Sequence, residues 1–375
     1  MRSTVYKYAS CHLRPQRLVI SHAIVTLESI LVSILYFIGL IPWPEYQRKK
    51  KRRGRPYVYH PTVIMRCFVV RIWLRFDSNR ALHDFLAMDY PYNRKIMKAC
   101  GLTSLPDRRT FDRRLSTISA DIKESIAAMA VLLFVKERLV DPYIVAIDST
   151  LLRAKGHLWH KSSMIKGVVP RSGIDTDARW GFSHSKGWIF GYKLHITAST
   201  GSLIVPLSAD FTQADVQDNQ IYPAITYPLP QGVHYMAADS GYDDHKLYNL
   251  STDRGFELVC PVSQIYNNTS SDRLQLIEFY ESELGQVIYS WRSISIEPLI
   301  EHIKDVFKID PLPVRWYQKA AGLVLLSVLL YQIIVYYNCK THKEHPKAIK
   351  HMLGSYNRCQ NNVKKGKAKL CPSLS

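Results

Sequence analysis

Two short apolar runs, each ending in Asp-Ser, constrain the fold of this chain most. Residues 143–149 read Tyr-Ile-Val-Ala-Ile-Asp-Ser, and residues 234–240 read His-Tyr-Met-Ala-Ala-Asp-Ser. Consecutive apolar residues over so short a length, many of them β-branched or aromatic, are typical of a strand buried on both faces. The runs therefore predict two buried strands with Asp148 and Asp239 at their carboxyl ends.

The two aspartates together indicate a metal site. Open α/β sheets place their chemistry at the carboxyl ends of strands, so two neighbouring strands of this kind would bring Asp148 and Asp239 to one point. Carboxylate pairs are ligands for divalent metals such as Mg²⁺. The alternative is that Asp after a strand is ordinary turn chemistry. The recurrence of Ala-x-Asp-Ser favours the metal site.

The charge of the chain predicts a polyanionic partner. The sequence has 50 Lys and Arg against 31 Asp and Glu, a formal net charge of +19. This imbalance favours binding to nucleic acid or to an anionic membrane surface. The seven cysteines form no Cys-x-x-Cys pair, which argues against a disulfide framework or a zinc ribbon and favours a reducing compartment.

Two apolar stretches raise the alternative of a membrane-anchored protein. Residues 18–43 are interrupted by His22, Thr26 and Glu28, so we expect a core helix there. Residues 320–339 carry no charge and nearly reach the length of a spanning helix. Gln332 and the tyrosines of this second stretch, with basic residues on both flanks, favour a helix buried inside a domain. We therefore predict no membrane partner.

The first 140 residues predict a helical DNA-binding region that carries a basic arm at residues 48–56. The arm contains Arg53-Gly54-Arg55-Pro56, a form suited to laying Arg53 and Arg55 into the minor groove of A·T-rich DNA, although a plain flexible linker is the alternative. Helices are expected from Pro61, with apolar residues as far as Phe76 on one face, and after a cap at Ser78.

A further helix is expected to begin near Asp107, with an apolar stripe facing the core. Its other face is predicted to carry four arginines: Arg108, Arg109, Arg113 and Arg114. Such a face suits DNA phosphates or a major groove, and the alternative is a solvated basic surface. Residues 121–139 predict one more amphipathic helix.

The order of the remaining elements predicts an α/β fold with a ribonuclease-H-like mixed sheet flanked by helices. After the Asp148 strand comes a long loop, then two strands at 188–196 and 202–208 joined by a turn at Thr200-Gly201. A helix at 213–222, the Asp239 strand, a helix at 243–253 and a strand at 256–261 complete the order. In that fold the first and fourth strands are neighbours, so Asp148 is expected beside Asp239.

Several motifs, in this order, resemble those of the DDE transposases of bacterial and archaeal insertion sequences. They are Arg53–Pro56 before the helices, Asp107–Leu115, Asp177–Gly181, Gly191-Tyr-Lys-Leu-His195 and Ala238-Asp-Ser-Gly-Tyr242. The resemblance covers most of the chain. It implies three regions: DNA binding in 1–140, a catalytic domain in 141–340 and a basic tail in 341–375.

The third acid of that family lies in a Tyr-Arg-Glu-Lys signature on a helix, which Tyr289, Arg292, Glu297 and Lys304 resemble. Glu297 and Lys304 are seven residues apart and so share one helix face. The spacing between Arg292 and Glu297 is one residue longer than usual. Because Pro298 is best tolerated in a first turn, we expect the helix to begin at Glu297. The alternative is a mixed-charge surface helix in which Glu301 pairs with Lys304.

The resemblance implies a DNA transposase that cleaves element ends and transfers the 3′-hydroxyls to target DNA. Asp148, Asp239 and Glu297 would be catalytic and hold two Mg²⁺ ions, or Mn²⁺ in their place. DNA contacts would come from Lys193, Tyr289, Arg292 and Lys304. The expected partners are terminal inverted repeats and target DNA, bound by a homodimer on paired ends in the cytoplasm, associated with the nucleoid. The alternatives are a non-catalytic DNA-binding protein derived from a transposase and a zinc site at His184, His195 and His234.

Overall fold

The computed structural model describes residues 27–44, 58–183, 185–262, 270–341, 345–350 and 352–353. The basic arm with Arg53 and Arg55, together with His184 and most of the tail from 341 to 375, lies outside the described residues. Their predicted roles stay predictions, as does the division of the chain into three regions. The first described element is α1 (Leu27–Ile38), which lies in the stretch expected to form a core helix and buries Leu31, Ile34, Leu35 and Ile38.

Helices make up the N-terminal part of the described chain. They are α2 (Pro61–Trp73), α3 (Asn79–Ala87), α4 (Pro91–Cys100), α5 (Arg108–Leu115), α6 (Ser119–Val131) and a short π-helical turn (Leu132–Lys136). The Ser78 side chain accepts a hydrogen bond from the Ala81 amide, so the predicted cap is confirmed. Helix α2 ends earlier than predicted, before Phe76, because Arg75 adopts the left-handed conformation with a φ of 55°.

A mixed sheet forms the other half of the molecule, with strands β1 (Ile144–Arg153), β2 (Arg179–Ser183), β3 (Gly187–Ser199), β4 (Pro206–Gln213), β5 (Tyr235–Ala237) and β6 (Glu257–Val259). β3 pairs with β2, β4 and β1, all antiparallel. On its other side β1 pairs with β5, and β5 pairs with β6, both in parallel. The predicted adjacency of the two Asp-bearing strands is confirmed. β2 was not predicted, because its residues lie in the stretch interpreted as a long loop.

Two predicted boundaries are wrong because strand partners extend the strands. β1 runs on to Arg153, held along its length by β3, so Asp148 lies inside a strand and not at its end. β4 reaches Gln213, opposite Tyr192, and α8 therefore begins only at Asp218 (Asp218–Thr226).

The register of β1 and β5 nevertheless brings the two aspartates level. Their parallel pairing ends with Ala146 opposite Ala237. Asp148 and Asp239 each lie two residues beyond that pair. The two carboxylates therefore meet where the parallel pairing stops.

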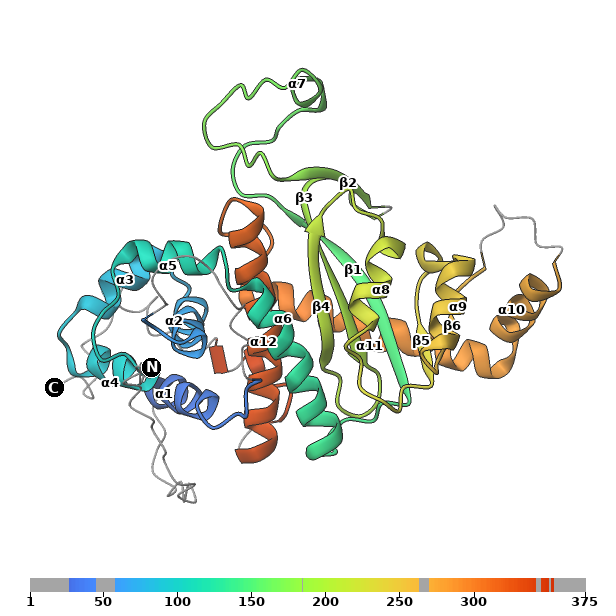
Figure 1. Cartoon of the computed structure of the whole chain (residues 1–375), viewed down its shortest axis with the longest axis horizontal. Coiled ribbons are helices and arrows are strands. Elements are labelled where there is room, and N and C mark those ends of the chain that lie inside the picture. Colours follow the sequence, from blue (N-terminus) through green and yellow to red (C-terminus); the bar gives the residue numbers. More distant parts are fainter. Residues whose placement is uncertain are drawn as a thin grey trace, which may run out of the picture.

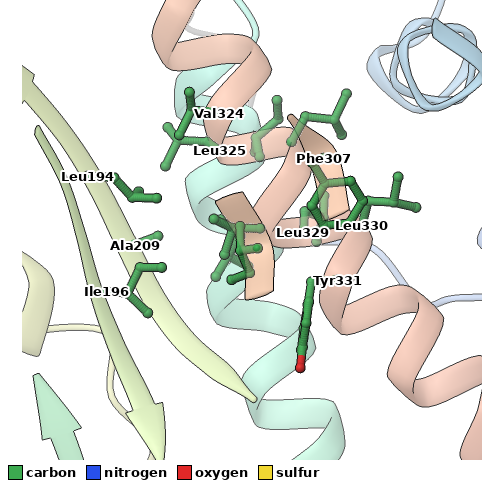
Figure 2. Close-up of a cluster of buried hydrophobic side chains, with 14 of the residues drawn as sticks. Leu194, Ile196, Ala209, Phe307, Val324, Leu325, Leu329, Leu330 and Tyr331 are labelled. Atoms are coloured by element: carbon green, nitrogen blue, oxygen red, sulfur yellow. The ribbon is translucent and has the colours of Figure 1, made fainter. Parts of the chain in front are cut away.

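Helix α12 (Tyr317–Thr341) lies at the centre of the molecule, between the N-terminal helices and the sheet (Figure 1). Its Val324, Leu325, Leu329 and Leu330 pack toward Leu194, Ile196 and Ala209 of the sheet and toward Phe307 at the end of α11 (Glu283–Phe307) (Figure 2). It is long and apolar enough to cross a membrane, and 94% of its most apolar 18-residue stretch is buried inside the fold. The prediction of a buried core helix is confirmed.

The side-chain nitrogen of Gln332 binds two backbone carbonyls inside this core. Its side-chain amide is fully buried and donates hydrogen bonds to the Ile126 and Pro206 carbonyls, at 3.1 and 2.8 Å. One bond reaches α6 and the other reaches the start of β4. The amide therefore fixes α12 against both elements.

The half of the molecule that holds the sheet also contains α9 (His245–Asp253), α10 (Ser271–Glu281) and α11 (Glu283–Phe307). α11 packs across β1, β3 and β5. It runs through Pro298, so the prediction that a helix begins at Glu297 is wrong. An internal proline costs roughly 3 kcal/mol. Burial of Ile296, Leu299, Ile300 and Ile303 on the sheet offsets that cost.

Candidate active site

Three carboxylates from three elements converge on the guanidinium of Arg292. Arg292 Nη2 lies 3.1 Å from Asp148 Oδ2 on β1 and 3.9 Å from Asp239 Oδ2 after β5. Arg292 Nη1 lies 2.7 Å from Glu297 Oε1, one turn further along α11. The structure therefore brings together the three acids that the sequence singled out, with one cation between them.

Backbone amides aim the two aspartates. Asp148 Oδ1 accepts a hydrogen bond from the Ser149 amide at 2.7 Å, and Asp239 Oδ1 accepts one from the Gly241 amide at 3.0 Å. Asp239 also caps the short 3₁₀ turn Ser240–Tyr242. One oxygen of each carboxylate is thus held by the chain, and the Oδ2 atoms face the shared cation.

Burial makes this cluster of charges costly without a cation. Burial raises the pKa of Asp148 to about 6. The charge of Arg292 and the hydrogen bond from the Ser149 amide act in the opposite direction and favour the ionised form. Burial also raises the pKa of Asp239, which is the more exposed of the two. For Arg292, burial opposes the charged form, but the three carboxylates outweigh it and raise its pKa. The geometry therefore favours a positive charge at this point.

Glu297, and not Glu301, faces the aspartates. Glu301 accepts a hydrogen bond from Lys304 at 2.8 Å and lies 3.7 Å from Lys186, so its carboxylate is engaged elsewhere. The Glu301–Lys304 pair that a plain surface helix would have is thus present as well. Lys304 itself is buried and donates to Thr150 Oγ1 at 3.3 Å, which links α11 to β1 two residues after Asp148.

A second polar cluster lies beside Asp239 and centres on Asp218, at the start of α8. Lys193 donates to Asp218 Oδ1 at 3.1 Å and to the Val216 carbonyl at 2.9 Å. His195 Nδ1 lies 3.4 Å from the same oxygen, and burial lowers the pKa of His195 to about 4. Asp218 adds negative charge near Asp239. We did not single out Asp218 from the sequence, because the helix predicted at 213–222 put this residue in the middle of a helix and not at its start.

The predicted DNA-binding residues are divided between the surface and the interior. Arg108, Arg109 and Arg113 are exposed on α5, capped by Asp107. Arg114 is 4% exposed, so the prediction that it shares their exposed face is wrong. It lies three residues after buried Phe111 and therefore on the core side of the helix.

The remaining predicted residues lie near the carboxylates or apart from them. Tyr289 is half-buried against Tyr280, and the charges of Arg292, Asp239 and Glu297 act on its hydroxyl. His195 is hydrogen-bonded to Thr212, whereas the His234 ring packs in a tilted arrangement against Tyr143. With His184 outside the described residues, the zinc alternative stays untested.

The donor chemistry of the carboxylate cluster suits a hard divalent cation. Among the described residues, no three His, Cys, Asp or Glu side chains lie close enough together to form a metal site. The Arg292 guanidinium lies between the three carboxylates. The three carboxylates around the guanidinium offer oxygen, which is the ligand type that Mg²⁺ and Mn²⁺ prefer. The three residues therefore have the donor type that such an ion takes, and the guanidinium occupies the position between them.

Comparisons with solved structures give distant similarities. A cryo-EM structure of the piggyBac transposase synaptic complex with hairpin DNA is similar over 94% of this chain and 84% of that chain, with 10% identity and a TM-score of 0.41. A crystal structure of a pre-cleavage Mos1 transpososome is similar over 76% of this chain and 81% of that chain, with 10% identity and a TM-score of 0.17. TM-scores this low do not establish a shared fold. No curated protein matches the chain.

The family comparison is decisive. Residues 140–333 match the family described as the transposase DDE domain. This match extends over more than half of the chain and includes Asp148, Asp239, Arg292 and Glu297. The protein therefore belongs to the transposase DDE domain family.

Proposed function

We propose that this transposase cleaves DNA strands at the ends of its element and joins the released 3′-hydroxyls to target DNA. The observation that carries the proposal is the convergence of Asp148, Asp239 and Glu297 on one cationic group. The strand order supports a ribonuclease-H-like fold, because β1 lies between antiparallel β3 and parallel β5.

Asp148, Asp239 and Glu297 would hold the divalent ions that transposases of this family generally use. Two bound Mg²⁺ ions would supply Lewis acidity to an in-line phosphoryl transfer, activating the attacking oxygen and stabilising the departing one. Arg292 keeps the three carboxylates compensated. Its planar guanidinium can also donate paired hydrogen bonds to a DNA phosphate at the cut.

The charge distribution supports DNA as the partner. The chain carries a net charge of +19, and Arg108, Arg109 and Arg113 present cations on the outer face of α5. Terminal inverted repeats would bind this region and the basic arm, with the target DNA near the carboxylates. We further propose a homodimer on paired ends, acting in the cytoplasm on nucleoid DNA.

A cleavage assay on the DNA that flanks the gene tests the proposal. We expect the wild-type protein to cut this DNA with Mg²⁺ or Mn²⁺. Asp148→Asn, Asp239→Asn and Glu297→Gln should each lower the cleavage rate at least about 100-fold, because the lost metal ligand stabilises the transition state by several kcal/mol. DNA affinity should change little in these variants.

Glu301→Gln is the matched control, because it removes the same charge one helical turn away from Glu297. We expect it to keep cleavage within about tenfold of the wild type, a change of up to about 1.4 kcal/mol in barrier height. Loss of activity in Glu301→Gln with activity kept in Glu297→Gln would refute the assignment of the third acid. DNA binding by the wild type without cleavage in either metal would favour the non-catalytic alternative.

A further inference from the structure

The loop between β1 and β2 stands away from the rest of the molecule. Residues 154–174, which we call the projecting loop, include the short helix α7 (Lys161–Ile165). Figure 1 shows α7 on a long excursion beyond the ends of β2 and β3, with no other element around it. The carboxylate cluster does not use this loop, and the core does not require its tip.

Hydrogen bonds fix the base of the projecting loop. The Trp159 indole is buried and donates to the Val168 carbonyl at 2.9 Å, and the Trp180 indole donates to the Trp159 carbonyl at 2.7 Å. Lys155 Nζ donates to the Pro313 carbonyl at 2.7 Å. The loop is therefore held in one arrangement before any partner binds, which lowers the entropic cost of binding.

The tip of this fixed loop is apolar and open to solvent. Ile165 is 86% exposed, and Leu158, Val168 and Val169 are each about half exposed. These four aliphatic side chains expose apolar surface to water, and they do not pack in the core of the molecule. Such a projection is typical of a contact site for another molecule.

The same loop carries only positive charge. Residues 154–174 contain Lys155, Lys161, Lys166 and Arg171, with two histidines and no Asp or Glu. Lys161 Nζ lies 3.1 Å from the centroid of the Trp188 ring. In the described part of the chain, no carboxylate forms an ion pair with any of these four cations. Lys155 contacts the Pro313 carbonyl and Lys161 lies over the Trp188 ring, so the charges of Lys166 and Arg171 are the ones available to an anionic partner.

We propose that the projecting loop binds the DNA duplex beside the cleavage site, with Lys166 and Arg171 on phosphates and Ile165 against the bases of the groove. This inference rests on the proposed function and adds a second DNA-contacting element to it. An apolar side chain between cations suits the minor groove, where apolar side chains press on base steps. A second copy of the chain that packs loop against loop fits less well, since the projecting loop of each copy carries four cations and no carboxylate.

The path of β1 gives the place of the contact on the DNA. The projecting loop leaves β1 at Arg153, five residues beyond Asp148, which is about 17 Å along the strand at about 3.3 Å per residue. Each base step of a duplex covers about 3.4 Å. For a duplex that runs along β1, the loop should touch DNA roughly five base pairs from the cut, or further for its tip.

Salt-dependent DNA binding by the full chain tests the electrostatic part. We expect Lys166→Gln with Arg171→Gln to flatten the slope of log K against log salt by up to about 1.8, since each phosphate contact contributes about 0.9. Lys308→Gln with Lys350→Gln is the matched control. It removes the same charge from two exposed lysines that pair with Asp305, and it should leave the slope unchanged. An unchanged slope in the loop variant would overturn the proposal.

Ile165→Ser tests the apolar contact, and its exposure means that the fold should tolerate it. We expect binding to weaken about tenfold with the salt slope unchanged, as for a side chain of this size that loses its burial in the complex. Wild-type affinity in Ile165→Ser would overturn the apolar contact. Sedimentation of a wild-type dimer without DNA and an Ile165→Ser monomer would show a self-association surface instead. If the wild-type chain binds no DNA, the proposed function is refuted as well. If the wild type binds DNA and the loop variants bind it with the same affinity and salt slope, only the role of the projecting loop is refuted.

Discussion

Replacement of Arg292 by alanine should destabilise the fold and make its stability depend on metal. The Arg292 side chain is 14% exposed, and its most buried partner, Asp148, is 13% exposed. Removing one member of a fully buried ion pair costs 3–5 kcal/mol, and an exposed pair contributes about 0–1 kcal/mol. Because Asp239 and Glu297 are partly open to solvent, we expect an intermediate loss of about 2 kcal/mol in the free energy of unfolding.

Urea denaturation with and without Mg²⁺ measures this effect. Arg153→Ala serves as the control, because Arg153 pairs with Asp310 at 3.0 Å but is 60% exposed, and its loss should cost less than about 1 kcal/mol. Mg²⁺ should raise the midpoint of Arg292→Ala more than that of the wild type, since the ion would replace the missing guanidinium between the carboxylates. Equal stability of Arg292→Ala and Arg153→Ala, with no added effect of Mg²⁺, would refute this reasoning.

Three further predictions concern the core, the polar cluster and the basic arm. Gln332→Leu should lower the free energy of unfolding by about 2–3 kcal/mol, because two buried carbonyls lose their donor, and a urea midpoint within error of the wild type would contradict this. His195 has a pKa of about 4 in the fold against 6.5 when unfolded, and it faces Asp218, Lys193 and Asp210. The stability that comes from neutral His195 is complete above pH 6.5 and is lost as pH falls toward 4. Between pH 7 and pH 4.5, the free energy of unfolding of His195→Gln should therefore fall by about 2 kcal/mol less than that of the wild type. Equal losses in the two proteins would contradict this prediction. Deletion of residues 48–56 should flatten the salt slope of DNA binding and weaken binding to A·T-rich ends most, whereas an unchanged slope would count against a DNA-binding arm.

The sequence was most informative where one local pattern had a single structural consequence. Two apolar runs ending in Asp-Ser predicted neighbouring buried strands, and β1 and β5 pair as expected. On α11, the seven-residue spacing from Lys304 singled out Glu297, and the Glu297 carboxylate contacts Arg292 in the cluster. These features depend on side-chain period and burial, which a sequence records directly.

Features that depend on distant partners were not predictable in the same way. β1 extends past Asp148 because β3 pairs with it as far as Arg153, and no residue near Asp148 encodes that length. α11 continues through Pro298 because the sheet buries both flanks, so tertiary packing overrides the local preference. The spacing of Arg114 from Phe111 could have indicated its burial. The position of Arg292 between three acids could not be read from its place in the chain.

Binding of Mn²⁺, followed by electron paramagnetic resonance, tests the central claim most directly: that Asp148, Asp239 and Glu297 form one cation site. The unbound ion gives a signal that falls as the protein takes it up, so the measurement needs neither DNA nor activity. We predict saturable binding by the wild type, and binding weakened by at least about tenfold, or about 1.4 kcal/mol, in Asp148→Asn with Asp239→Asn. Glu301→Gln should bind like the wild type. Equal Mn²⁺ affinity in the wild type and the double aspartate variant would contradict the account.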